Sequence, residues 1–290
     1  MIFNTLKTTA LLAVLTGLLM LMGHWLGGTS GLLIGLLLAT AMNFGSYWFS
    51  DQIALRMAGA QEVSDAEAPE LHTLVTRLAQ AAGLPTPRLA VIHSDAPNAF
   101  ATGRNAHHSV VAVTTGILRL LNQRELEAVL AHELGHIRNR DMLVSSIAAT
   151  IAGAITMIAQ MGQFALLFGG PRQDDEEGGG GGVFGGLLML LVAPLAATII
   201  QLAISRAREF GADRIGARVS RDPEALATAL EKIEAYAQGI PLPVHPAVSH
   251  LFIVQPLTGF SIQKLFSTHP PTAERVARLR QMAHEFPGQQ

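Results

Sequence analysis

Four apolar stretches, each long enough to cross a lipid bilayer, constrain this sequence more than any other feature. A helix needs about 20 mostly apolar residues to span the hydrocarbon core. Only 14% of the 290 residues are charged, whereas soluble domains carry about 25%, so the composition also indicates a membrane protein. The lengths argue against the alternative of helices buried in a soluble core. The predicted spans are residues 6–26, 31–49, 142–168 and 183–204.

The first two stretches are separated only by residues 27–30. A cleaved signal peptide also contains an apolar run, but here a second span follows at once and no clear cleavage site precedes it. We therefore expect an uncleaved helical hairpin. Between the last two spans, residues 171–182 are acidic and then contain five consecutive glycines. This composition is typical of a flexible linker, and a partner-binding loop is the alternative.

Lysine and arginine lie almost entirely on one side of the predicted spans. Lys7, the arginines between residues 56 and 140, and the basic residues from Arg206 onward share that side. Only Arg172 lies on the other side. Because positively charged loops stay in the cytoplasm, both termini and the polar segments are expected to be cytoplasmic.

The chain contains no cysteine. This excludes disulfide bonds, a cysteine nucleophile and thiolate metal ligands, so any metal must bind to His, Asp or Glu. The net charge of −2 gives no sign of a nucleic-acid partner.

Residues 132–136 read His-Glu-Leu-Gly-His. Asn122 is a suitable N-cap and Glu125 completes a capping box, so this segment is predicted to be helical. Two histidines four residues apart project from one helix face and can bind one zinc ion. Glu133, beside His132, is placed to take a proton from a zinc-activated water and to deliver it to a leaving amine. A chance match of two surface histidines is the alternative.

A third ligand is predicted in the segment Ser205-Arg-Ala-Arg-Glu209-Phe-Gly-Ala-Asp213. Glu209 would join His132 and His136 and leave a fourth position open, as in catalytic zinc sites. Asp213 is placed to accept the second ring proton of a ligand histidine. Surface ion pairs are the alternative for both carboxylates. Since Glu209 and His136 lie within six residues of predicted spans, zinc is expected just off the cytoplasmic face of the membrane.

Two short runs rich in Val and Ile, residues 88–93 and 109–114, predict strands. A strand edge beside zinc can bind a substrate peptide by main-chain pairing. We expect Asn98, Ala99 and Phe100 to take part in this binding. A hairpin that only packs under the motif helix is the alternative.

Together these segments resemble the HtpX membrane proteases, relatives of the CaaX prenyl endopeptidases. The resemblance covers nearly the whole chain. It implies that His132, His136 and Glu209 bind one Zn²⁺ per chain and that Glu133 is catalytic. It also implies that His269 and Arg275 contact the developing oxyanion, whereas a loop cap and an exposed helix face are their alternatives. The resemblance rests on the motif at 132–136, the segment at 205–213, Pro97-Asn-Ala-Phe-Ala-Thr-Gly103 and Ser267-Thr-His-Pro-Pro-Thr272.

The family resemblance further implies a cellular role. HtpX proteases degrade misfolded or damaged membrane proteins at the bacterial cytoplasmic (inner) membrane without ATP, often as a stress response. Membrane-protein or unfolded polypeptide substrates and the lipid bilayer are therefore the expected partners, and the sequence does not indicate an oligomeric state.

The expected fold is mainly helical α+β, a gluzincin-type metalloprotease domain with four transmembrane helices in two hairpins. Residues 1–50 are expected to form the first hairpin, and residues 142–205 the second, with the acidic and Gly-rich loop at 169–182. Residues 51–141 and 206–290 are expected to form the two parts of a cytoplasmic metalloprotease domain.

Three other functions compete with this interpretation. A non-catalytic membrane zinc-binding or chaperone-like protein would have no need for Glu133. An intramembrane protease would have to bury charges such as Arg124 and Glu127 in hydrocarbon. A transporter is disfavoured because the third and fourth spans contain no ionisable residue. Iron or cobalt would also suit two histidines and a carboxylate, but a hydrolytic site favours zinc.

Overall fold

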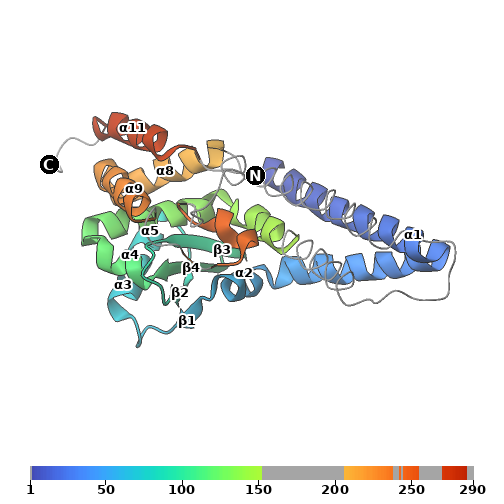
Figure 1. The fold of residues 1–290 in the computed structure, drawn as a ribbon. Coiled ribbons are helices and arrows are strands. Elements are labelled where there is room, and N and C mark those ends of the chain that lie inside the picture. Colours follow the sequence, from blue (N-terminus) through green and yellow to red (C-terminus); the bar gives the residue numbers. More distant parts are fainter. Residues whose placement is uncertain (1, 152–205, 238–241, 243, 255–269, 286–290) are drawn as a thin grey trace.

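The computed structural model describes residues 2–151, 206–237, 242, 244–254 and 270–285. An apolar helical hairpin projects from a part that combines a small sheet with helices on both of its faces (Figure 1). The described elements are α1 (Ile2–Trp48), α2 (Ser50–Ala58), β1 (Gln61–Val63), α3 (Pro69–Ala82), β2 (Arg88–Ile92), β3 (Ala99–Asn105), β4 (His108–Thr114), α4 (Thr115–Leu120), α5 (Gln123–Asn139), α8 (Arg206–Ser220), α9 (Pro223–Ala237), η1 (Pro246–Leu251) and α11 (Thr272–Ala283).

The segment α1 consists of two antiparallel helices, as the sequence predicts. Its helical geometry breaks at Gly27 and Gly28, and Gly28 has a φ of 57°, which glycine adopts without steric cost. The two arms approach closely, because a Cβ atom on Gly23 would lie 2.1 Å from the backbone oxygen of Gly31. Glycine is therefore required both at the turn and in the contact between the arms.

Among the described residues, one helix is long and apolar enough to cross a membrane, Gly27–Trp48. It corresponds to the span predicted at 31–49. Leu6–Leu21 and Met142–Ile151 are shorter apolar helices. The spans predicted at 142–168 and 183–204 lie mostly or wholly outside the described residues, and so does the loop at 169–182. Four spans therefore remain a prediction, as does the division of the chain into domains.

The sheet is mixed, with the strand order β1-β2-β4-β3. The strands predicted at 88–93 and 109–114 are present as β2 and β4, and they pair in parallel. They are therefore not the two arms of a hairpin. Instead β3, which lies between them in the sequence, pairs antiparallel with β4 and forms one edge of the sheet.

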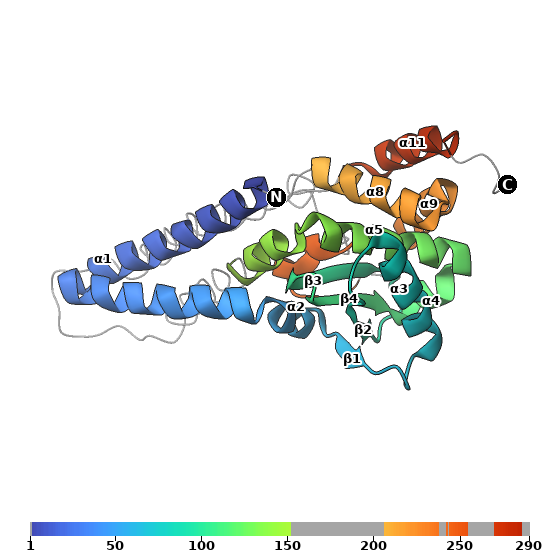
Figure 2. The same cartoon turned by 180° about the vertical axis from the view of Figure 1, so that it is seen from behind.

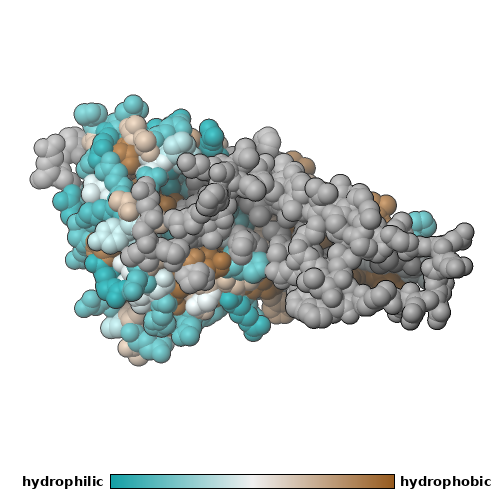
Figure 3. Space-filling view, viewed as in Figure 1, coloured by the Kyte–Doolittle hydropathy of each residue, from teal (hydrophilic) through white to brown (hydrophobic). Residues whose placement is uncertain are grey.

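Helices cover both faces of this sheet, so most residues of β2, β3 and β4 are buried, whereas β1 is mostly exposed (Figures 1 and 2). On one face Ala99 and Val111 belong to the same buried cluster as Leu130 of α5, together with residues of α3 and α9. On the other face Phe100 and Ala112 belong to a cluster with residues of α2 and η1. Hydrophilic residues dominate the visible surface of this part of the molecule (Figure 3). The predicted class, mainly helical α+β, is confirmed, with a small mixed sheet.

Candidate zinc site

Helix α5 begins at a well-defined N-terminus and carries the His-Glu-Leu-Gly-His motif. The Asn122 side chain accepts a hydrogen bond from the Glu125 amide, and the Glu125 carboxylate accepts one from the Asn122 amide. This is the predicted capping box. Lys232 of α9 also binds both Glu125 carboxylate oxygens, at 2.7 and 2.8 Å. The start of the motif helix is thus fixed from two directions.

Close packing against α8 brings the third predicted ligand to this helix. A Cβ atom on Gly135 would lie 3.0 Å from the backbone of Ala212, and one on Gly216 would lie 3.0 Å from the backbone of His132. Because neither glycine carries a side chain, the two helices can approach this closely. As a result, Glu209 of α8 lies opposite the two motif histidines.

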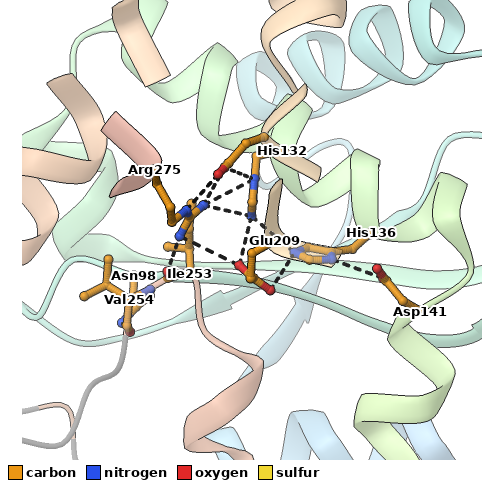
Figure 4. A network of polar contacts seen from close by, with 9 residues as sticks. Asn98, His132, His136, Asp141, Glu209, Ile253, Val254 and Arg275 are labelled. Atoms are coloured by element: carbon orange, nitrogen blue, oxygen red, sulfur yellow. Dashed lines mark hydrogen bonds and ion pairs between the residues drawn. The ribbon is translucent and has the colours of Figure 1, made fainter. Parts of the chain in front are cut away.

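The three predicted ligands converge on one point (Figure 4). The Nε2 atoms of His132 and His136 are 3.2 Å apart. Glu209 carboxylate oxygens lie 4.0 Å from Nε2 of His132 and 3.7 Å from Nε2 of His136. All three ligand atoms fall within 4.8 Å of one another. A single ion can therefore contact all of them.

The donor set matches zinc in chemistry as well as position. Both Nε2 atoms face the carboxylate, while the other ring nitrogens point away toward two further carboxylates. Nδ1 of His132 lies 2.9 Å from Asp213, and Nδ1 of His136 lies 3.1 Å from Asp141. Such carboxylates fix the tautomer that leaves Nε2 free to bind a metal. Two imidazoles, one carboxylate and an open fourth position are a catalytic zinc set, and these residues fit the ion.

A buried guanidinium group holds one of these outer carboxylates in place. Arg275 of α11 donates from Nε and Nη2 to the two oxygens of Asp213, at 2.9 and 2.7 Å. Its Nη1 donates to the Ile253 carbonyl at 3.1 Å. Arg275 is 1% exposed, so the alternative of an exposed helix face is wrong. Asp213 thus lies beside Nδ1 of His132, and its role in orienting that ligand stays a prediction.

The electrostatics of the site follow from burial and these charge pairs. Burial lowers the pKa of His132, and Asp213 opposes this effect only in part. At His136 burial also lowers the pKa, but the charges of Asp141 and Glu209 outweigh it and raise the pKa to about 10. Burial raises the pKa of Asp213, but Arg275 and His132 bring it down to about 2. Without metal, the cluster therefore binds a proton at His136.

Glu133 is buried next to the ligand cluster. It is 1% exposed, and within the described residues neither of its oxygens makes a hydrogen bond of normal geometry. Burial and the nearby charge of Glu209 raise the pKa of Glu133 to about 7. A carboxyl group of this pKa can both accept and release a proton near neutral pH.

The residues predicted to bind substrate lie at the start of β3 and are buried. Asn98, Ala99 and Phe100 are at most 1% exposed. The Asn98 side chain donates from Nδ2 to the Val254 carbonyl at 2.7 Å, and the Ile253 backbone amide donates to the Ala99 carbonyl at 3.0 Å. Residues 252–254 thus occupy this end of the β3 edge. His269 lies outside the described residues.

Sequence reasoning missed two contributors to the site. Asp141 follows the motif helix and holds His136, and the backbone of Ile253 holds Arg275. Asp141 does carry a local signal in the sequence, because an aspartate five residues after a ligand histidine is close enough to reach it. Ile253 offers none, since its carbonyl would be equally present with any other side chain.

Comparison with known proteins agrees with this geometry. The family model described as Peptidase family M48 matches residues 65–283. The chain is 52% identical over 284 residues to the protease HtpX homolog of Paraburkholderia phytofirmans, covering 97% of this chain and 98% of that one. It is 51% identical over 277 residues to the protease HtpX homolog of Desulforapulum autotrophicum, covering 96% and 89%.

The fold is also similar to a solved structure. The crystal structure of S. mikatae Ste24p matches with a TM-score of 0.51 and 22% identity, over 96% of this chain and 66% of that one. This likeness concerns the fold alone. The matching family model, the close relatives and the converging ligands lead to one conclusion: the chain belongs to the M48 family of zinc metallopeptidases, as an HtpX homolog.

Proposed function

We propose that this M48 peptidase is an integral membrane endopeptidase that hydrolyses peptide bonds of misfolded or damaged membrane proteins at the cytoplasmic face of the bacterial inner membrane. The observation that carries the catalytic part is Glu133, a buried carboxylate beside the three zinc ligands with a pKa raised to about 7. A protein that only stored or sensed zinc would have no use for an ionisable group in this place.

The chemistry divides between the metal and the side chains. When bound, zinc polarises the peptide carbonyl and lowers the pKa of a water molecule. His132, His136 and Glu209 hold the ion, and Asp213 orients His132 through Nδ1. Glu133 accepts the proton of the attacking water at its carboxylate and passes it to the nitrogen of the leaving amine.

His269 and Arg275 are proposed to stabilise the oxyanion, on the strength of the family resemblance. Arg275 is well placed to carry positive charge into the site, since its Nη1 lies 3.8 Å from Glu209. All three of its nitrogens are also engaged with Asp213 or Ile253. Arg275 would therefore contact a reacting carbonyl while it continues to hold Asp213.

An extended substrate peptide is proposed to pair with the β3 edge of the sheet. Asn98, Ala99 and Phe100 would form the wall at one end of this groove, where residues 252–254 are already hydrogen-bonded to the strand. The aromatic ring of Phe100 packs on Phe252 with centroids 4.9 Å apart, which stiffens this wall. The peptide would then lie beside the neighbouring residues of β3.

The membrane location is supported by the surface of α1. Leu21, Ile34 and Leu37 are each more than 65% exposed, which suits contact with lipid and is costly in water. At the end of this helix, Arg104 of β3 donates to the Trp48 carbonyl and stacks on the Trp48 ring. This contact ties the sheet to the end of the candidate span. The distribution of Lys and Arg favours the cytoplasmic side.

The test compares the wild-type protein with Glu133→Gln, both purified in detergent. Zinc content and cleavage of casein are measured on the same samples. We expect one zinc per chain in both proteins and a loss of cleavage of at least about 100-fold in the variant, because general acid–base catalysis contributes about 10² to 10⁴. The matched control is Glu127→Gln, which lies on the same helix but pairs with Arg77 and should cleave like the wild type.

Two results would contradict the proposal. Undiminished cleavage by Glu133→Gln would exclude this carboxylate as the base. Zinc in every sample without cleavage of casein or of an unfolded membrane protein by the wild type would favour the competing function, a non-catalytic zinc-binding or chaperone-like protein.

A further inference from the structure

Asp141 contacts one zinc ligand twice, through its backbone and through its side chain. Its amide donates to the His136 carbonyl at 3.3 Å, and its Oδ1 lies 3.1 Å from Nδ1 of His136. The first contact belongs to the turn that ends α5, and the second fixes the imidazole ring. One residue therefore holds both the main chain and the ring of the same ligand.

The turn at the end of α5, which places Asp141 beside His136, requires a backbone conformation that is unfavourable for Arg140. Arg140 has a φ of 55° and lies in the left-handed region, where helix ends usually have glycine. A side chain there is disfavoured, and strained residues of this kind gather at functional sites. In this conformation the amides of Arg140 and Asp141 donate to carbonyls of the last turn of α5, which places Asp141 beside that turn.

The surroundings of Asp141 leave its carboxylate directed at His136. The residue is 2% exposed, and its Oδ2 has no hydrogen-bond partner among the described residues. A buried carboxylate is unfavourable unless it is paired, and the ring of His136 is its hydrogen-bonded partner here. Figure 4 shows Asp141 on the side of His136 opposite Glu209.

Asp141 also begins the next helix. Its carbonyl accepts a hydrogen bond from the Ser145 amide at 3.3 Å, inside the apolar helix Met142–Ile151. That helix packs through Val144, Ile147 and Ile151 against residues of α1. The ligand histidine is thus joined, through one residue, to the helices proposed to lie in the membrane.

We propose that Asp141 is a positioning residue for zinc: it orients His136 so that Nε2 faces the metal, and it fixes this ligand to the start of the helix Met142–Ile151. Asp213 provides the equivalent contact for His132 from α8. The inference requires only the zinc site and is independent of the substrate and of the proposed membrane role.

The test measures zinc affinity of the full chain in detergent, by competition with a chelator, for Asp141→Ala, Asp141→Asn and the wild type. Loss of an outer carboxylate typically weakens metal binding about 10- to 100-fold. We expect this loss for Asp141→Ala. A smaller loss is expected for Asp141→Asn, whose amide oxygen still accepts from Nδ1. The control is Asp95→Asn, an exposed carboxylate paired with Arg119, which should bind zinc like the wild type.

Two further measurements separate positioning from a general loss of structure. The absorption spectrum of the cobalt-loaded protein should change in Asp141→Ala, because the direction of one ligand changes. Cleavage by this variant should recover when free zinc is raised above its new Kd. An unchanged zinc Kd in Asp141→Ala, or in Asp141→Asn if the alanine variant does not fold, would overturn the proposal. A lower melting temperature with unchanged Kd would also overturn it.

Discussion

The two histidine ligands differ in their contact with solvent and in their charge before metal binds. The side chain of His132 is fully buried and that of His136 is 17% exposed. Burial keeps His132 neutral, whereas Asp141 and Glu209 raise the pKa of His136 to about 10. The more exposed ligand, His136, is therefore also the one that carries the proton in the zinc-free site.

This difference predicts that zinc binding releases a proton. At pH 8 a His136 with a pKa of about 10 is protonated, and zinc must displace that proton to reach Nε2. We expect about one proton per zinc at this pH, and an apparent affinity that rises about tenfold per pH unit between pH 8 and pH 10. Glu133, with a pKa of about 7, is already mostly ionised there.

Calorimetric titrations of the protein with zinc, in buffers with different ionisation enthalpies, measure directly how many protons are released per zinc bound. If the observed heat does not depend on the buffer at pH 8, then no proton is released. That result would show that His136 is neutral in the zinc-free protein and that the two carboxylates do not dominate its pKa.

At the level of secondary-structure elements, the site depends on how closely α5 and α8 approach. A Cβ atom on Gly216 would lie 3.0 Å from Cα and N of His132, whereas among the described residues one on Gly211 would meet only the Asn139 side chain, at 3.3 Å. Both glycines lie on the same helix. An alanine at Gly216 would therefore push α5 and α8 apart, whereas an alanine at Gly211 would not, so the two substitutions form a matched pair.

We predict that Gly216→Ala lowers both stability and zinc affinity. Overpacking a tight contact costs about 1–3 kcal/mol, and separation of the helices moves Glu209 away from the histidines. Gly211→Ala should leave the zinc Kd unchanged and keep or raise the melting temperature, because alanine favours a helix over glycine by about 0.5–1 kcal/mol. Melting temperature and zinc Kd are measured for both variants. Equal effects of the two would refute a special role for the contact at Gly216.

The sequence predicts the zinc ligands well because their spacing is a property of a helix. His132 and His136 share one face whatever the fold around them. The capping box at Asn122 and the hairpin of α1 could be predicted for the same reason, because each depends on residues that are close together in the sequence. The parallel pairing of β2 with β4 was not predictable, because register between distant strands is set by tertiary packing. The contact of Asn98 with Val254 spans 156 residues and leaves no local pattern.

At the scale of the whole molecule, the zinc site lies where the hairpin meets the sheet. The end of α1 is fixed to β3 by Arg104, and the helix after Asp141 packs on α1. In the proposed topology, a site in this position would reach polypeptide that leaves the bilayer on the cytoplasmic side. This arrangement supports the proposed substrate class only if both polar parts of the chain lie on the same side of the membrane.

The absence of cysteine makes that topology directly measurable. A single cysteine at Glu70, exposed on α3, should react with a membrane-impermeant maleimide in inside-out vesicles and not in intact spheroplasts. A cysteine at Glu176, in the predicted loop between the third and fourth spans, should show the opposite pattern, because one predicted span separates it from each of the two protease parts. The unmodified chain provides the blank. Labelling of both positions from the cytoplasmic side would mean that residues 142–204 do not form a transmembrane hairpin, and the zinc site would then be anchored by α1 alone.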